Sequence, residues 1–117
     1  MHEFSIAQAL ADQVMRYAPE GARVREVEIQ VGVMRGLEPE AMTMSWEAVT
    51  LDTPIAGCVL RVDLRPWTIT CSECGRSWSS PVPFVDCECG NKTPIPVGSD
   101  ELNLVSIVVD EDEAAEA

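Results

Sequence analysis

The segment from residue 66 to residue 98 constrains this fold most, because it is too rich in cysteine, proline and glycine to be held by an apolar core alone. Its 33 residues include four of the five cysteines, five prolines and three glycines. The cysteines lie in Cys71-Ser72-Glu73-Cys74-Gly75 and Cys87-Glu88-Cys89-Gly90. Four thiolates in two clusters at this separation suit a tetrahedral structural zinc site. Zinc would also supply folding free energy that so small a segment lacks. We therefore predict a zinc-binding subdomain with the ligands Cys71, Cys74, Cys87 and Cys89.

The spacing of the second cysteine pair is irregular, since it reads C-x-C rather than C-x-x-C. Alternate side chains of an extended segment share a face, so the two sulfurs would be parallel but spread unless a turn at Glu88 brings them together. If the second pair had the regular spacing of two intervening residues and ended at Cys89, its first ligand would be Asp86. The fourth ligand is therefore Cys87, which we prefer, or Asp86.

Other residues near the cluster are assigned to packing. We expect Trp67, Trp78 and Phe84 to pack around the metal site, and Cys58 to be a small core side chain of a neighbouring strand. Two other interpretations of the cluster stay open, a C-x-x-C redox pair and loose thiols.

The charge balance is strongly acidic, with 20 Asp and Glu against 8 Lys and Arg. No basic stripe exists, which argues against a nucleic-acid partner. The chain shows no signal peptide and no apolar run long enough for a membrane span, so we expect a cytoplasmic protein without a membrane partner. In that reducing compartment, metal binding explains the cysteines better than disulfides do.

Hydrophobic periodicity predicts two helices. Ser5 and Gln8 read as a capping box, and apolar residues at helical spacing follow, so the first helix is expected at about 5–18. Pro39 suits the first turn of a second helix that continues toward residue 50.

Three strands are expected in addition. Residues 27–33 and 58–65 alternate between apolar and polar side chains, as half-buried strands do. Residues 102–109 are apolar on both faces, which predicts a strand in the middle of the sheet.

The expected fold class is therefore α+β, a small three-stranded sheet with two helices plus an inserted zinc-ribbon-like subdomain. We divide the chain into a domain of residues 1–65 and 99–109, the inserted subdomain 66–98, and an acidic disordered tail, 110–117.

The only histidine is His2. A terminal amine, the backbone nitrogen of His2 and its imidazole could close two fused chelate rings around one metal ion. Such a nitrogen-rich, near-planar donor set suits Ni(II) or Cu(II) better than Zn(II). Taken alone, the same two residues also fit a frayed terminus in which His2 has no role.

Several motifs together resemble the HypA/HybF family of hydrogenase nickel-insertion proteins. They are the start Met1-His2-Glu3-Phe4-Ser5-Ile6-Ala7-Gln8, the strand end Val31-Gly32-Val33, the helix opening Glu38-Pro39-Glu40-Ala41, and the two cysteine clusters. The resemblance runs from Met1 to about Val109.

The resemblance implies a nickel metallochaperone for [NiFe]-hydrogenase maturation, and not an enzyme. It implies His2 as a nickel ligand, with Met1 and Glu3 as supporting ligands, while Glu38 falls where relatives often carry an aspartate. The implied partners are a HypB-type GTPase and the hydrogenase large subunit, and a weak homodimer is a further possibility. The alternative is a zinc-ribbon interaction or regulatory module without a nickel role.

Overall fold

The computed structural model describes residues 2–110 and groups them into two compact units. One unit comprises residues 2–30, 37–63 and 103–110, and the other comprises residues 31–36 and 64–102. The expected acidic tail lies outside the described residues except for Asp110. That residue belongs to the last strand, where its carboxylate approaches Arg23 at 3.9 Å and Arg25 at 3.8 Å.

Helix α1 spans His2–Tyr17 and begins earlier than the sequence predicts. The prediction that Ser5 is the N-cap was wrong, because Ser5 lies inside the helix and its Oγ donates to the carbonyl of His2 at 3.1 Å. A serine hydroxyl can bond to the preceding helical turn as readily as it can cap a helix. His2 is consequently the first described residue of a regular helix.

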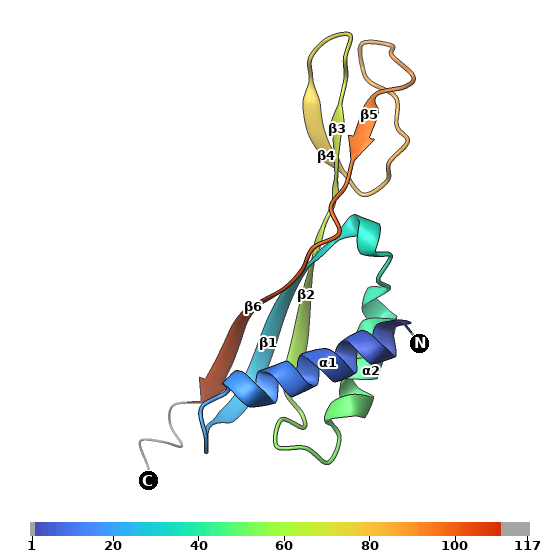
Figure 1. The fold of residues 1–117 in the computed structure, drawn as a ribbon. Coiled ribbons are helices and arrows are strands. Elements are labelled where there is room, and N and C mark those ends of the chain that lie inside the picture. Colours follow the sequence, from blue (N-terminus) through green and yellow to red (C-terminus); the bar gives the residue numbers. More distant parts are fainter. Residues whose placement is uncertain (1, 111–117) are drawn as a thin grey trace. The chain divides into compact units, whose positions relative to one another are not determined.

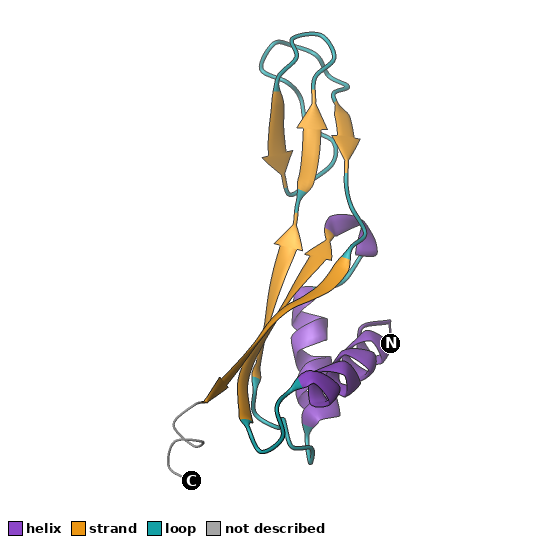
Figure 2. Cartoon of the chain, turned by 60° about the vertical axis from the view of Figure 1, so that its left-hand side comes forward, coloured by secondary structure: helices purple, strands orange, loops and turns teal. Residues whose placement is uncertain are grey.

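Three strands form a sheet whose residues belong mostly to the first unit: β1 (Arg23–Gly32), β2 (Val59–Arg65) and β6 (Leu102–Asp110), in the order β2-β1-β6. Both helices lie on the same side of this sheet (Figures 1 and 2). The prediction that the last strand is central was wrong, because β6 is an edge strand whose apolar side chains are at most half-buried. Strand β1 is central, and its Val27 and Ile29 are fully buried.

Helix α2 spans Pro39–Thr50, as predicted from the position of Pro39. Its Met42 and Trp46 are buried against α1, which contributes Ala7, Leu10, Ala11 and Val14 to the same core. The indole nitrogen of Trp46 donates to the carbonyl of Cys58 at 3.2 Å, so the buried polar atom of the largest core side chain has a partner.

The second unit contains a three-stranded sheet that the sequence pattern did not reveal. Strands β3 (Trp67–Thr70), β4 (Ser77–Ser80) and β5 (Ile95–Val97) pair antiparallel in the order β4-β3-β5. These strands are three or four residues long, too short to establish an alternating pattern. Only Ile69 of the central strand is a fully buried apolar residue, so the sheet has little core of its own.

A 3-10 turn, η1 (Val33–Arg35), completes the second unit. Just before it, the backbone nitrogen of Gly32 donates to the carbonyl of Glu101 at 2.8 Å. A Cβ atom on Gly32 would overlap the backbone carbonyl of Ser99, so only glycine fits at this crossing. None of the helices within residues 2–110 is long and apolar enough to cross a membrane.

Candidate metal centres

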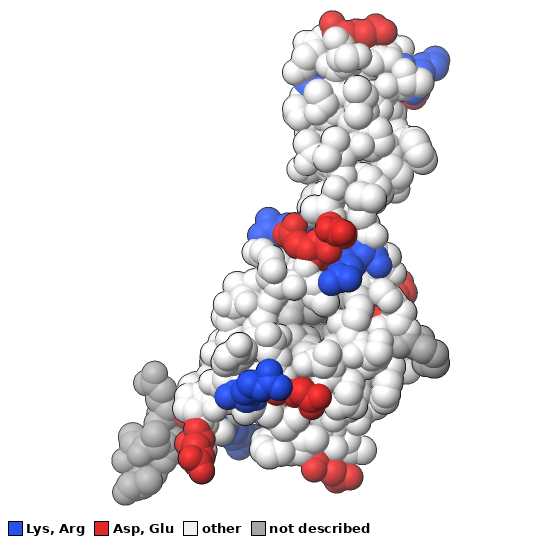
Figure 3. Space-filling view, in the orientation of Figure 1, with Lys and Arg blue, Asp and Glu red and all other residues white. Residues whose placement is uncertain are grey.

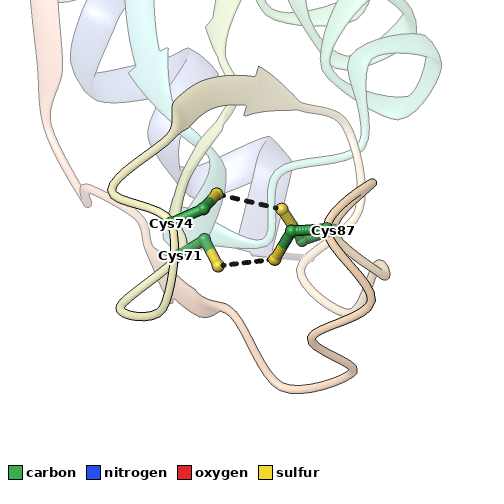
Figure 4. A group of neighbouring side chains, drawn as sticks. Cys71, Cys74 and Cys87 are labelled. Atoms are coloured by element: carbon green, nitrogen blue, oxygen red, sulfur yellow. Dashed lines mark hydrogen bonds between the residues drawn. The ribbon is translucent and has the colours of Figure 1, made fainter.

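The second unit brings the four predicted cysteines together. The four Sγ atoms all lie within 4.8 Å of one another. Cys71 and Cys89 are 3.6 Å apart, as are Cys74 and Cys87, and each of these close contacts joins one cysteine cluster to the other (Figure 4). A tetrahedron of sulfurs around zinc, with Zn–S bonds of about 2.3 Å, has sulfur–sulfur distances of about 3.8 Å. The donor set and its spacing therefore fit a tetrahedral thiophilic ion.

Each of the two cysteine loops is closed by two backbone hydrogen bonds, and the arrangement of these bonds is the same in both loops. In the first loop, Cys71 donates to the carbonyl of Arg76 and accepts from Gly75, both at 2.8 Å. In the second, Cys87 donates to the carbonyl of Asn91 and accepts from Gly90, both at 2.9 Å. Each hydrogen bond of the second loop therefore spans one residue fewer than its counterpart in the first loop. This shorter loop accommodates the C-x-C spacing and still directs both sulfurs into the cluster.

The conformation of each loop depends on its glycine. Gly75 and Gly90 have φ angles of 79° and 105°, in a region that other residues rarely adopt. The glycine after each cysteine pair therefore reverses the chain and lets the loop close. Asp86, the alternative fourth ligand, lies outside the sulfur cluster, and its carboxylate is 3.6 Å from the Lys92 ammonium.

Neighbouring groups shift the pKa values of Cys71 and Cys89 in opposite directions. The side-chain amide of Asn91, together with backbone N–H groups of Cys74 and Glu73, lowers the pKa of Cys71 to about 6. The pKa of Cys89 is raised to about 12, because the neighbouring sulfurs outweigh the opposing effect of the Asn91 backbone.

Two polar side chains at this site were missed in the sequence. Asn91 donates to Cys71 Sγ, and Arg76 forms a 2.7 Å ion pair with Glu88. Arg76 follows the first cysteine loop and Glu88 separates the second pair, so this exposed ion pair joins the two loops. The one sequence feature that could have indicated Asn91 and Arg76 is their position, because each comes directly after a Cys-Gly dipeptide.

The aromatic residues contribute less than predicted. Trp67 and Trp78 are half-buried, but the expectation that Phe84 packs around the site was wrong, because its side chain is 85% exposed. Phe84 lies between Pro83 and Cys87 in a loop without regular structure, where no strand fixes its direction. Cys58 is buried one residue before β2, and burial raises the pKa of its thiol, as expected for a core residue.

The first unit holds the predicted amino-terminal residues. His2 is exposed as the first residue of α1, and Met1 lies outside the described residues. The Glu3 carboxylate accepts a hydrogen bond from the backbone nitrogen of Glu38 at 3.0 Å, and this bond is the main cause of its lowered pKa. Glu38 is in turn the N-cap of α2, and its side chain accepts from Glu40 at 2.9 Å. The structure thus brings Glu38 to Glu3, the residue that follows His2 in the sequence.

The surface charges do not form a nucleic-acid footprint on the face that Figure 3 shows. Within each unit, the Lys and Arg side chains on this face stand in small separate groups with acidic neighbours. Among the described residues, Arg61 forms an ion pair with Glu26, and Lys92 forms one with Asp86. A DNA- or RNA-binding surface would need a basic patch or stripe.

The fold and the cysteine site define a small α+β protein with a zinc-ribbon-like subdomain that carries a four-cysteine metal-binding cluster. The family model described as "Hydrogenase/urease nickel incorporation, metallochaperone, hypA" matches residues 1–109. The chain belongs to this family of nickel-incorporation metallochaperones.

Curated relatives are similar in sequence to this protein over nearly its whole length. A hydrogenase maturation factor HypA of Streptomyces avermitilis is 33% identical, with 92% of this chain and 86% of the relative covered. The HypA of Chlorobium luteolum is 32% identical, with 96% and 98% covered. The solution structure of the Ni metallochaperone HypA from Helicobacter pylori has a TM-score of 0.58 at 18% identity, covering 93% of this chain and 97% of that one, and so shares the fold.

Proposed function

We propose that this protein binds Ni(II) at its amino terminus and delivers it during [NiFe]-hydrogenase maturation, acting as a carrier rather than an enzyme. The observation that carries the proposal is the exposed His2 at the very start of α1, in a chain that belongs to the nickel-incorporation family. His2 supplies the imidazole, and the Met1 amine and Glu3 are the supporting ligands.

The start of a helix suits the backbone part of this donor set. The first four N–H groups of an α-helix have no partner inside the helix. The backbone nitrogen of His2 belongs to this group, so nickel binding there would break no helical hydrogen bond. The positive end of the helix dipole opposes a bound cation, which weakens binding and favours transfer to a partner.

Binding at these nitrogens is coupled to proton release. The amine, the backbone nitrogen and the imidazole can each donate a lone pair only without the proton that occupies it. Nickel affinity should therefore fall as the pH is lowered. The donor set does not exclude copper, which binds nitrogen ligands more tightly than nickel, so selectivity would depend on metal supply and partners.

In the second unit, we propose that Cys71, Cys74, Cys87 and Cys89 hold a structural Zn(II). The sulfur spacing, the closed Cys-Gly loops and the scarcity of buried apolar residues around them support this. Zinc would link the two loops and stabilise the short strands of the subdomain.

We propose a HypB-type GTPase and the hydrogenase large subunit as the partners, since nickel must come from one protein and reach another. Four closely spaced thiols require a reducing compartment if they are to bind metal rather than form disulfides, so we place the protein in the cytoplasm.

An extension of the chain tests the nickel site. Addition of Gly-Ser ahead of Met1 moves the free amine away from His2 while leaving every side chain in place. We expect nickel affinity, measured by calorimetry, to fall at least tenfold, with zinc content unchanged. An extended protein that binds nickel like the original would show that the amine is not a ligand.

A further inference from the structure

Asn91 is a buried polar residue that contacts the cysteine cluster from outside the four-residue donor set. Its Nδ2 donates to the Sγ of Cys71 at 3.3 Å. Asn91 is only 9% exposed, and Cys71 is fully buried. The contact therefore lies away from solvent, where no water molecule would easily replace the amide.

The orientation of the Asn91 amide is fixed by its other end. Its Oδ1 accepts from the backbone nitrogen of Thr93 at 3.0 Å and from the Thr93 hydroxyl at 3.3 Å. Because a backbone N–H can only donate, the atom facing it must be the oxygen. The N–H₂ end consequently faces the sulfur of Cys71.

The Asn91 amide also joins the two cysteine loops. Asn91 closes the second loop by accepting from the Cys87 nitrogen at 2.9 Å, whereas Cys71 opens the first loop. One residue thus closes the second loop through its backbone and reaches the first through its side chain.

The four sulfurs differ in their need for such a donor. Cys74 and Cys89 are exposed and can accept hydrogen bonds from water, whereas Cys71 and Cys87 are buried, and Cys71 accepts a side-chain hydrogen bond from Asn91. A tetrathiolate zinc site carries two excess negative charges, and donors that hydrogen-bond to the ligands orient them and offset this charge.

We propose that Asn91 is a positioning residue of the tetracysteine site, which holds the Cys71 sulfur in its ligating position and fastens the second cysteine loop to the first. The inference rests on the proposed zinc site. Loss of the amide donor should loosen Cys71 and speed metal release.

Asn91→Asp tests this with little change of shape. Aspartate keeps an oxygen for Thr93 but has no N–H for Cys71, and it adds one negative charge. Lys92→Gln is the matched control, because it lowers the net charge by the same amount one residue away, at an exposed side chain paired with Asp86. Each variant is loaded with Zn(II), and release to a chelator is timed. The Co(II)-substituted proteins are compared by their sulfur-to-cobalt charge-transfer bands.

We expect Asn91→Asp to release zinc about tenfold faster or more and to shift the charge-transfer bands, with Lys92→Gln within about twofold of the unmodified protein. If Asn91→Asp does not retain metal, Asn91→Gln, which keeps the N–H donor, should retain it. Unchanged release and bands in Asn91→Asp would overturn the proposal, as would an equal effect of Lys92→Gln or loss of metal from Asn91→Gln. An unmodified protein that binds neither Zn(II) nor Co(II) would instead overturn the proposed zinc site itself.

Discussion

Glu3 and Glu38 are joined by a hydrogen bond of 3.0 Å, from the backbone nitrogen of Glu38 to the Oε2 atom of Glu3. The bond ties the first turn of α1 to the N-cap of α2, although 35 positions separate the two residues. His2 therefore belongs to a helix end that is held against the second helix.

Replacement of Glu3 separates its tethering role from its proposed role as a ligand. In Glu3→Gln the amide oxygen can still accept from Glu38, but a neutral amide is a weaker metal ligand than a carboxylate. We expect nickel affinity to fall about tenfold, one lost ligand interaction of about 1.4 kcal/mol, with the zinc content and helical signal retained. Calorimetry and circular dichroism check this, and wild-type nickel affinity in Glu3→Gln would exclude the carboxylate as a ligand.

The same hydrogen bond predicts a pH dependence of stability. The Glu38 N–H favours the charged carboxylate and so lowers the pKa of Glu3 in the folded protein. A lowered folded pKa stabilises the fold above the unfolded pKa of about 4.3, and this contribution is lost as the pH falls through the folded pKa. Urea titrations should find the wild type more stable than Glu3→Gln at pH 7, with the difference shrinking as the pH is lowered below the unfolded pKa. A difference that stays constant as the pH is lowered would contradict this origin.

Paired substitutions decide the fourth zinc ligand. Cys87→Ser removes a sulfur from the cluster, so we expect it to lose zinc to a chelator that the wild type withstands. Asp86→Asn removes only a carboxylate that faces Lys92, and zinc retention should not change. Zinc content after chelator treatment measures both, and the reverse pattern would make Asp86 the ligand.

Gly32 should be intolerant of a side chain because the Ser99 backbone lies where its Cβ would be. The bond from Gly32 to Glu101 limits any movement away. We expect Gly32→Ala to cost about 3 kcal/mol in a denaturant titration of the zinc-loaded protein. Gly36→Ala is the comparison, since Gly36 has a φ of 70° but open space around it, and should cost about 1 kcal/mol. A smaller loss in Gly32→Ala than in Gly36→Ala would contradict the close approach.

Elements long enough to show a periodic hydrophobic pattern were predicted from the sequence, and the short strands of the second unit were missed. Helix α2 and strands β1 and β2 follow from spacing and from Pro39, and their bounds lie within a few residues of the prediction. The start of α1 was misplaced because a serine followed by glutamine fits both a cap and a helix interior. Strand order could not be predicted from β6, because an apolar edge strand and an apolar central strand look alike in sequence.

The cysteine site was likewise predicted only in part from the sequence. Residue type and spacing were enough to group Cys71, Cys74 and Cys89, whereas the positions of Cys87 and Asp86 relative to them depend on the loop conformation. The backbone closure that shortens the second loop by one residue has no sequence signature beyond Gly90. Asn91 was missed for a related reason, since its contact with Cys71 spans 20 positions and depends on how the two loops fold together.

Native mass spectrometry of the untagged protein and of His2→Ala, with and without added Ni(II), tests the central claim most directly. We predict one zinc in both proteins and one additional nickel in the wild type only, because the proposed nickel site needs the His2 imidazole while the cysteine site is in the other unit. Stoichiometric nickel on His2→Ala, with wild-type affinity, would contradict a nickel site at the amino terminus.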